Sequence, residues 1–106
     1  MTLTLRMAAA ILLAALVAGP AFAQSAGADV YKAKCANCHG ADGLANTAMG
    51  KNMKVLSFKD PAMLKGSYAQ FFAATRNGKG KMPGYSDKLT DEQIKAVTEY
   101  IRVLQK

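Results

Sequence analysis

The spacing of apolar residues is most informative at the carboxyl end of the chain. Four apolar residues recur there at intervals of three and four: Ile94, Val97, Ile101 and Leu104. This periodicity places them on one face of a helix. Thr90 and Gln93 form a capping box at its start. The pattern therefore predicts an amphipathic helix that begins after Thr90 and needs an apolar partner.

Two shorter helices are predicted upstream by their capping residues. Asp60 is an N-cap followed directly by proline, and this helix is expected to stop at Gly66. Ser67, with a glutamine three residues later, begins a second helix that stops at Gly78. Strand-like alternation of apolar and polar residues is missing from the sequence. The predicted fold class is therefore all-α.

A fourth helix is predicted at residues 27–37, where Val30 and Tyr31 are the bulky apolar residues. It is the only terminal helix available to the apolar stripe at the other end of the chain. We therefore expect the N- and C-terminal helices to pack together, in a fold of about four short helices. Three phenylalanines between them are assigned to the core: Phe58, Phe71 and Phe72.

Residues 1–23 have the three parts of a secretory signal peptide. An arginine supplies positive charge, residues 7–18 form an unbroken apolar run, and an Ala-Phe-Ala site ends at Ala23. The run of about a dozen apolar residues is shorter than a bilayer-spanning helix needs. We predict cleavage before Gln24, export to the periplasm without stable membrane insertion, and a single mature domain at 24–106.

Cys35, Cys38 and His39 form the motif Cys-Ala-Asn-Cys-His, by which c-type haem is attached covalently. Residues three and four apart share one face of a helix, so all three side chains can reach one flat ligand. Two thiols would bond to the porphyrin edge while the imidazole reaches the iron. A thioredoxin-like redox pair would need a βαβ context, and a closed zinc site would need four ligands, whereas the chain has two cysteines and one histidine.

The second axial position of a haem iron needs another group, because His39 is the only histidine. Methionine, lysine, a thin ligand such as water, or nothing are the alternatives. Met82 is the predicted ligand, since its soft thioether lies in a glycine-rich loop and the following proline keeps it extended. Met53 and Met49 are the other candidates. Met63 falls in a predicted helix and is assigned to the core.

The chain is basic, with 14 Lys and Arg against 7 Asp and Glu. A basic surface suits an acidic protein partner or a polyanion. Nucleic acid is the weaker choice, because the lysines are scattered and form no single run. Lys79, Lys81 and Lys88 are candidates for orienting an acidic partner beside the haem edge.

Three segments together resemble a class I mono-haem cytochrome c of the small soluble bacterial kind, similar to cytochromes c6 and c5. They are residues 35–40, 76–85 and 89–94. The resemblance covers essentially the whole mature chain. It implies one covalent haem c, with iron, enclosed by an all-α fold.

The resemblance also assigns roles. It implies thioether links through Cys35 and Cys38, His39 as the proximal ligand and Met82 as the distal ligand. It further implies that Gly27 lies where the terminal helices cross, near a tyrosine at position 100. One departure is that residues 46–50 contain no proline, whose carbonyl commonly accepts a hydrogen bond from the proximal histidine.

An iron with two protein ligands has no open site for substrate, so we predict an electron-transfer protein and not an enzyme. It would be a monomeric periplasmic shuttle whose redox partners have acidic docking surfaces. Those partners could be an oxidase, a quinol-oxidising complex, a dehydrogenase or a photosynthetic centre. The alternatives are a five-coordinate haem protein that binds a diatomic ligand, and a haem subunit of a larger oxidoreductase.

Overall fold

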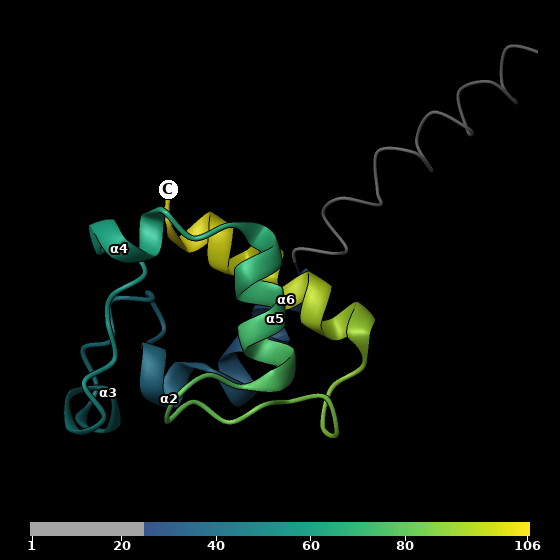
Figure 1. Ribbon diagram of the computed structural model, residues 1–106, viewed down its shortest axis with the longest axis horizontal. Helices are drawn as coiled ribbons and strands as arrows, with labels where there is room; N and C mark the ends of the chain where they lie inside the picture. The colour runs from purple at the N-terminus through teal and green to yellow at the C-terminus, as the bar shows by residue number, and fades with distance from the viewer. Residues whose placement is uncertain (1–24) are drawn as a thin grey trace, which may run out of the picture.

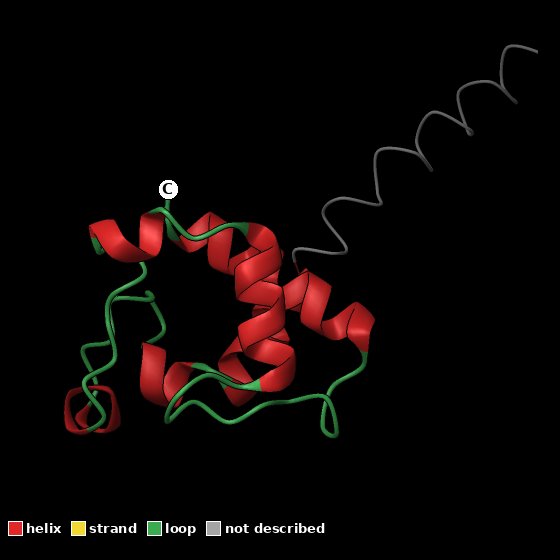
Figure 2. Ribbon diagram, in the orientation of Figure 1, coloured by secondary structure: helices red, strands yellow, loops and turns green. Residues whose placement is uncertain are grey.

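The computed structural model describes residues 25–106, and the predicted signal peptide lies outside the described residues. Residues 25–34 are helical, and five further helices follow: α2 (Ala36–His39), α3 (Ala48–Asn52), α4 (Pro61–Leu64), α5 (Tyr68–Asn77) and α6 (Asp91–Leu104). Figure 2 shows helices joined by loops throughout this part of the chain. The all-α prediction is confirmed.

The helix at 25–34 crosses α6 with its backbone in direct contact. A Cβ atom added at Gly27 would collide with the carbonyl of Ala96 and would lie 3.1 Å from Cβ of Tyr100. Only glycine lets the two helices approach so closely. The predicted crossing of the terminal helices at Gly27, near Tyr100, is confirmed.

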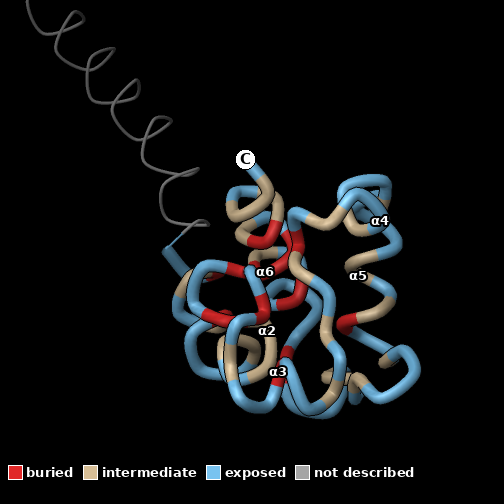
Figure 3. The backbone as a smooth tube through the Cα atoms, turned by 90° about the vertical axis from the view of Figure 1, so that its left-hand side faces the viewer, coloured by how far each residue is buried: buried red, intermediate tan, exposed pale blue. Residues whose placement is uncertain are grey.

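The core follows from the apolar stripe of α6. Ile94 and Val97 are fully buried, and Leu104 is partly buried. The principal core cluster joins this stripe to the amino-terminal helix and the loop before α4: Tyr31, Phe58, Val97 and Ile101. Figure 3 shows the buried segments gathered on and around α6, whereas α4 and α5 are mostly intermediate or exposed.

The predicted helix starts are confirmed by their capping hydrogen bonds. Ser67 and Thr90 each begin a complete capping box, in which the hydroxyl accepts from the third helical residue and the glutamine there accepts in return. The carboxylate of Asp60 accepts from the backbone N–H of Ala62 at 2.9 Å. These local bonds satisfy backbone donors that a helix leaves free at its start.

Two features differ from the prediction of about four helices. The helix expected at 27–37 is interrupted by a turn at Cys35 before α2 begins. The short helix α3 was not predicted. Thr47 caps it by accepting from Gly50 N at 2.9 Å, and its hydroxyl also donates to Asn37 O at 2.8 Å. This threonine therefore ties α3 to α2.

None of the helices in the described range 25–106 has the length and apolar composition that crossing a bilayer would require.

Gly27→Ala should destabilise the folded protein. The added methyl group meets backbone atoms of α6, which cannot rotate away, so overpacking should cost about 1–3 kcal/mol of unfolding free energy. Denaturant unfolding measures this. As a control, Ala33→Ser, at an exposed position of the same helix, should stay within about 0.5 kcal/mol of the parent. Equal effects of the two substitutions would contradict the crossing.

Candidate haem site

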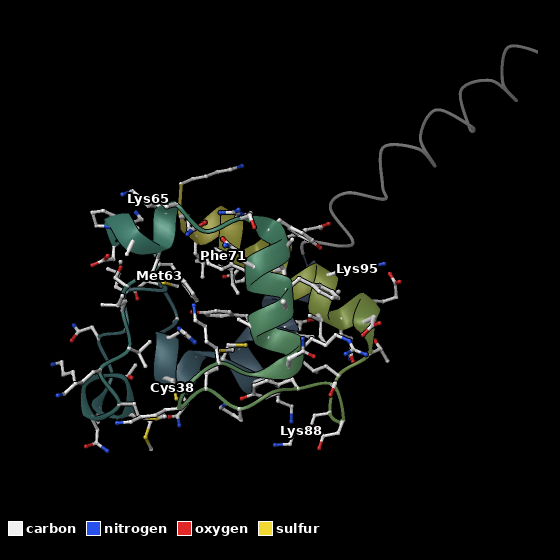
Figure 4. All side chains as sticks on the ribbon, in the orientation of Figure 1. Cys38, Met63, Lys65, Phe71, Lys88 and Lys95 are labelled. Atoms are coloured by element: carbon white, nitrogen blue, oxygen red, sulfur yellow. The ribbon has the colours of Figure 1, made fainter. Side chains whose placement is uncertain are left out.

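A large cavity lies between α2, α4, α5 and the loop that precedes α6. Its volume is about 1040 Å³, at the upper end of the usual range for ligand pockets. Cys35, Cys38, His39 and Met82 all line it. Figure 4 shows the labelled Cys38 on α2, with Met63 and Phe71 coming from α4 and α5 around the same central region. The structure thus brings the four predicted site residues to one cavity.

Helix α2 presents the two cysteines and the histidine together. The backbone N–H groups of Cys38 and His39 both donate to Cys35 O, at 3.3 and 3.0 Å. Gly40 then ends the helix, with a positive φ of 81° that glycine adopts without strain. The one-turn helix therefore gives the motif its shared face.

The end of α2 is fixed by a buried hydrogen bond. The hydroxyl of Tyr31 donates to Gly40 O at 2.6 Å, and Tyr31 is only 2% exposed. Burial is the main reason that the pKa of this phenol is raised well above its usual value. Tyr31 thus links the amino-terminal helix to the residue that follows His39.

The imidazole of His39 is half-buried and has no hydrogen-bond partner at Nδ1 among the described residues. Burial lowers its pKa, which favours the neutral ring with a free lone pair. Its ring stacks on Phe58, with centroids 4.7 Å apart and planes 13° from parallel. A neutral, ordered imidazole in a cavity of this size fits a haem iron ligand.

The two cysteines are unpaired thiols, and burial raises the pKa of Cys35 to about 11. Both side chains are therefore available for covalent attachment of a ligand in the cavity, and no disulfide competes in the described structure.

The remaining cavity lining is mostly apolar, with cationic side chains and two neutral amides, Gln70 and Asn77. Five lysines line it, and no aspartate or glutamate does: Lys34, Lys54, Lys65, Lys79 and Lys81. Lys88 lies elsewhere, with its ammonium 5.6 Å from the ring centroid of Tyr85. Such a lining suits a flat apolar ligand that carries carboxylates, as haem does.

The loop that carries Met82 is closely folded. Lys79 and Met82 exchange two backbone hydrogen bonds of 3.0 Å, which form a tight turn. A Cβ atom on Gly78 would lie 2.8 Å from Gly84 N, so the two arms of the loop touch through their glycines. Tyr85 N then donates to Thr75 O at 2.9 Å, which anchors the loop to α5.

The methionines divide by their position at the cavity. Met82 and Met63 line both the large cavity and an adjoining one of about 60 Å³, and His39 lines both as well. Met53 lines only the large cavity. Met49 is 41% exposed and lines neither. Met63 packs against the core as predicted, but it also faces the cavity, which the sequence pattern did not indicate.

Several residues at the site were missed or only partly understood from the sequence. Phe58 was assigned to the core alone, and its stacking on His39 was not foreseen. Thr47 and Gly50 fix the chain that follows the motif. One feature of the sequence could have predicted this contact: a threonine three residues before a glycine in a turn-rich segment. That signal is weak, because threonine and glycine are common in loops.

Comparisons with known proteins agree with this site. The family model described as cytochrome c oxidase, cbb3-type, subunit III matches residues 22–101. Cytochrome c6 of Bryopsis maxima is 40% identical over 78 residues, which are 71% of this chain and 84% of that protein. The cbb3-type cytochrome c oxidase subunit FixP of Azorhizobium caulinodans is 34% identical over 80 residues, which are 74% of this chain and 26% of FixP.

A solved structure, the KustC0563 c-type cytochrome, superposes with a TM-score of 0.69 at 29% identity, covering 76% of this chain and 98% of that one. The chain therefore belongs to the cytochrome c family, as a small class I cytochrome c. Its cofactor is covalently bound haem c with iron, and it is an electron-transfer protein.

Tyr31→Phe should destabilise the protein by about 1–3 kcal/mol, because Gly40 O loses its buried donor. Urea unfolding measures this. The hydroxyl of Tyr100 makes no hydrogen bond within residues 25–106, so Tyr100→Phe is the matched control and should change stability much less.

The effect of Tyr31→Phe should also depend on pH. A phenol whose pKa is raised by folding stabilises the fold fully below its unfolded pKa of about 10 and progressively less above it. The stability difference between the parent and Tyr31→Phe should therefore shrink as the pH rises beyond 10. A difference that stays constant up to pH 11 would contradict the buried, neutral phenol.

Proposed function

We propose that this protein is a soluble periplasmic carrier of single electrons, with haem linked through Cys35 and Cys38 and iron bound by His39 and Met82. The observation that carries the proposal is that all four side chains line one cavity. A c-type haem supplies a one-electron iron couple whose potential is raised by His/Met ligation. The two thioethers would hold the cofactor, and the two axial ligands would close the iron to substrates.

The surrounding residues have supporting tasks. Phe71, Met63 and Val55 contribute apolar surface to the cavity and exclude water from it. An apolar shell around the iron disfavours the form with higher net charge, which is the oxidised one. The closely folded loop of Met82 keeps the thioether in place whether the protein is oxidised or reduced. Little reorganisation is then needed when an electron is passed.

The location follows from the amino-terminal sequence. We infer that residues 1–23 are a signal peptide cut before Gln24 and that residues 24–106 form the mature domain. The same export would place the cysteines outside the cytoplasm, where this kind of haem attachment takes place.

The lysines at the cavity rim support an acidic protein as the redox partner. Lys79 and Lys81 are exposed in the turn that leads into Met82, and no carboxylate lines the cavity beside them. Such a charge arrangement speeds encounter with an acidic surface and gives weak, rapidly exchanging docking of a monomer. Nucleic acid does not fit an exported chain with scattered lysines.

A haem subunit of a larger oxidoreductase is the second candidate, and the match to FixP favours it. The matched residues are about a quarter of that oxidase subunit, so the likeness concerns the haem domain alone. Purification from the native membrane and soluble fractions decides between the two: recovery as a free monomer supports the shuttle, and stable recovery with an oxidase supports the subunit.

Met82→Ala should open the iron to added ligands. The parent protein should show a low-spin haem spectrum in both oxidation states and no prompt reaction with carbon monoxide. The variant should bind carbon monoxide within mixing time, because its iron has lost the distal thioether. Absorption spectroscopy of the reduced protein measures this.

Met53→Ala and Met63→Ala are the matched controls, since both side chains also line the cavity. Each should keep the parent spectrum. Carbon monoxide binding by one of these controls, with none by Met82→Ala, would show that a different methionine is the ligand. Prompt binding by the parent protein would instead support the five-coordinate alternative.

Lys79 and Lys81 at the edge of the cavity should raise the rate at which an anionic oxidant accepts an electron from the reduced protein. Replacing Lys79 and Lys81 by glutamate should slow oxidation of the reduced protein by ferricyanide about tenfold at low ionic strength, and the difference should shrink with added salt. Stopped-flow absorption measures the rate. Lys51→Glu, at an exposed residue outside the cavity lining, is the control. An equal effect of Lys51→Glu would mean that net charge alone matters.

A further inference from the structure

The His39 ring packs on an aromatic side chain and is not held by a hydrogen bond at Nδ1 within residues 25–106. Its Nδ1 is buried and has no hydrogen-bond partner among the described residues. Residues 46–50, which run into α3, lack the proline whose carbonyl commonly orients such a ring, and no other group within residues 25–106 takes over the bond. The contact that does restrict the ring is the nearly parallel stack on Phe58, at 4.7 Å and 13°.

Phe58 is itself held in place from several directions. Its backbone N–H donates to Gly43 O at 2.9 Å, and its side chain is only 4% exposed. A Cβ atom on Gly43 would lie 2.9 Å from Cδ2 of Phe58, so this glycine makes room for the ring. The ring centroids of Tyr31 and Phe71 lie 6.5 and 6.3 Å from that of Phe58, with both rings tilted against it. The ring of Phe58 therefore has little freedom to tilt.

The carboxyl end of the chain fastens the same loop. Gln105, the C-cap residue of α6, donates from Nε2 to Phe58 O at 3.0 Å and to Met63 O at 3.3 Å. Its Oε1 accepts from Nη1 of Arg102 at 2.9 Å, and that guanidinium lies 4.9 Å from the ring centroid of Phe71. Figure 1 shows the carboxyl end of α6 close to α4. One carboxamide thus joins α6 to the loop that carries Phe58.

We propose that Phe58 is the positioning residue for the His39 imidazole. Gln105, through its hydrogen bond to Phe58 O, keeps the Phe58 ring in its stacked position on that imidazole. This inference rests on the proposed function, since it takes His39 to be an axial iron ligand. Phe58 acts through the histidine ring and does not touch the iron. In this chain an aromatic stack performs the orienting task that a backbone hydrogen bond commonly performs.

The plane of an axial imidazole determines which porphyrin orbitals it overlaps. Rotation of that plane redistributes unpaired spin among the ring substituents of the ferric haem, without removing the ligand. A residue that only fills space would change stability and leave this distribution alone. The spin distribution therefore separates a positioning role from a packing role.

The first test compares Phe58→Leu with Phe72→Leu in the haem-loaded protein. Phe72 is a half-buried phenylalanine outside the cavity lining, so it controls for loss of a ring. Proton NMR of the ferric protein measures the hyperfine-shifted haem methyl resonances. We expect their spread and order to change in Phe58→Leu and to match the parent in Phe72→Leu. The reduction potential should shift in Phe58→Leu only.

The second test acts through Gln105 and leaves the aromatic ring intact. Gln105→Glu removes the donor and turns an oxygen toward two carbonyls, and Gln105→Met removes the donor without adding charge. Both should move the methyl resonances in the same sense as Phe58→Leu, by a smaller amount. Gln93→Glu is the matched control in the same helix, because that side chain only accepts hydrogen bonds, from the backbone N–H and the hydroxyl of Thr90.

The outcomes separate the inference from the proposed function. Methyl resonances that stay at the parent positions in Phe58→Leu and in both Gln105 variants, while stability falls, would overturn the positioning role. His/Met ligation would be untouched by that result. A parent protein without a low-spin ferric spectrum would instead overturn His39 and Met82 as ligands. If Phe58→Leu fails to fold, the Gln105 variants carry the test alone.

Discussion

The contact on which the rest of the structure depends is the crossing of the amino-terminal helix over α6 at Gly27. Because backbone meets backbone there, neither helix can slide or rotate without a clash. One turn further along, Tyr31 reaches Gly40 and fixes the end of α2. The position of His39 therefore follows from a glycine twelve residues earlier in the chain. A single close approach of two helices thus places the residue proposed to bind iron.

The domain has a small core of its own, and that core lies on one side of a large cavity. Four residues form the main buried cluster, while α4 and α5 turn apolar side chains toward the cavity, among them Met63 and Phe71. A chain of about eighty residues buries only about 60–65% of its unfolded surface, so it has little stability to spare. Covalent haem completes the interior, and the apolar lining that excludes water also stabilises the fold. Structure and redox chemistry then depend on the same side chains.

The sequence predicted features that depend on local chemistry. Both capping boxes, the apolar stripe of α6 and the shared face of Cys35, Cys38 and His39 need only neighbouring residues, and each appears as expected. Helix α3 escaped prediction because a five-residue helix has no periodicity to detect. The contacts of Phe58 with His39 and with Gln105 also escaped, since they join residues 19 and 47 positions apart. Long-range packing of this kind leaves no local pattern in a single sequence.

The paired glycines of the Met82 loop separate two tasks that lie only a few residues apart. Gly78 and Gly84 touch at the base of the loop and leave no room for a side chain, whereas nothing lies within 4 Å of a Cβ atom added at Gly80. The base is thus committed to the geometry of the methionine, whereas the tip has open space around it, with Gly80 itself required by its φ of 57°. The exposed side chains beside it, Lys79 and Lys81, can therefore be exchanged without disturbing the backbone that holds the methionine.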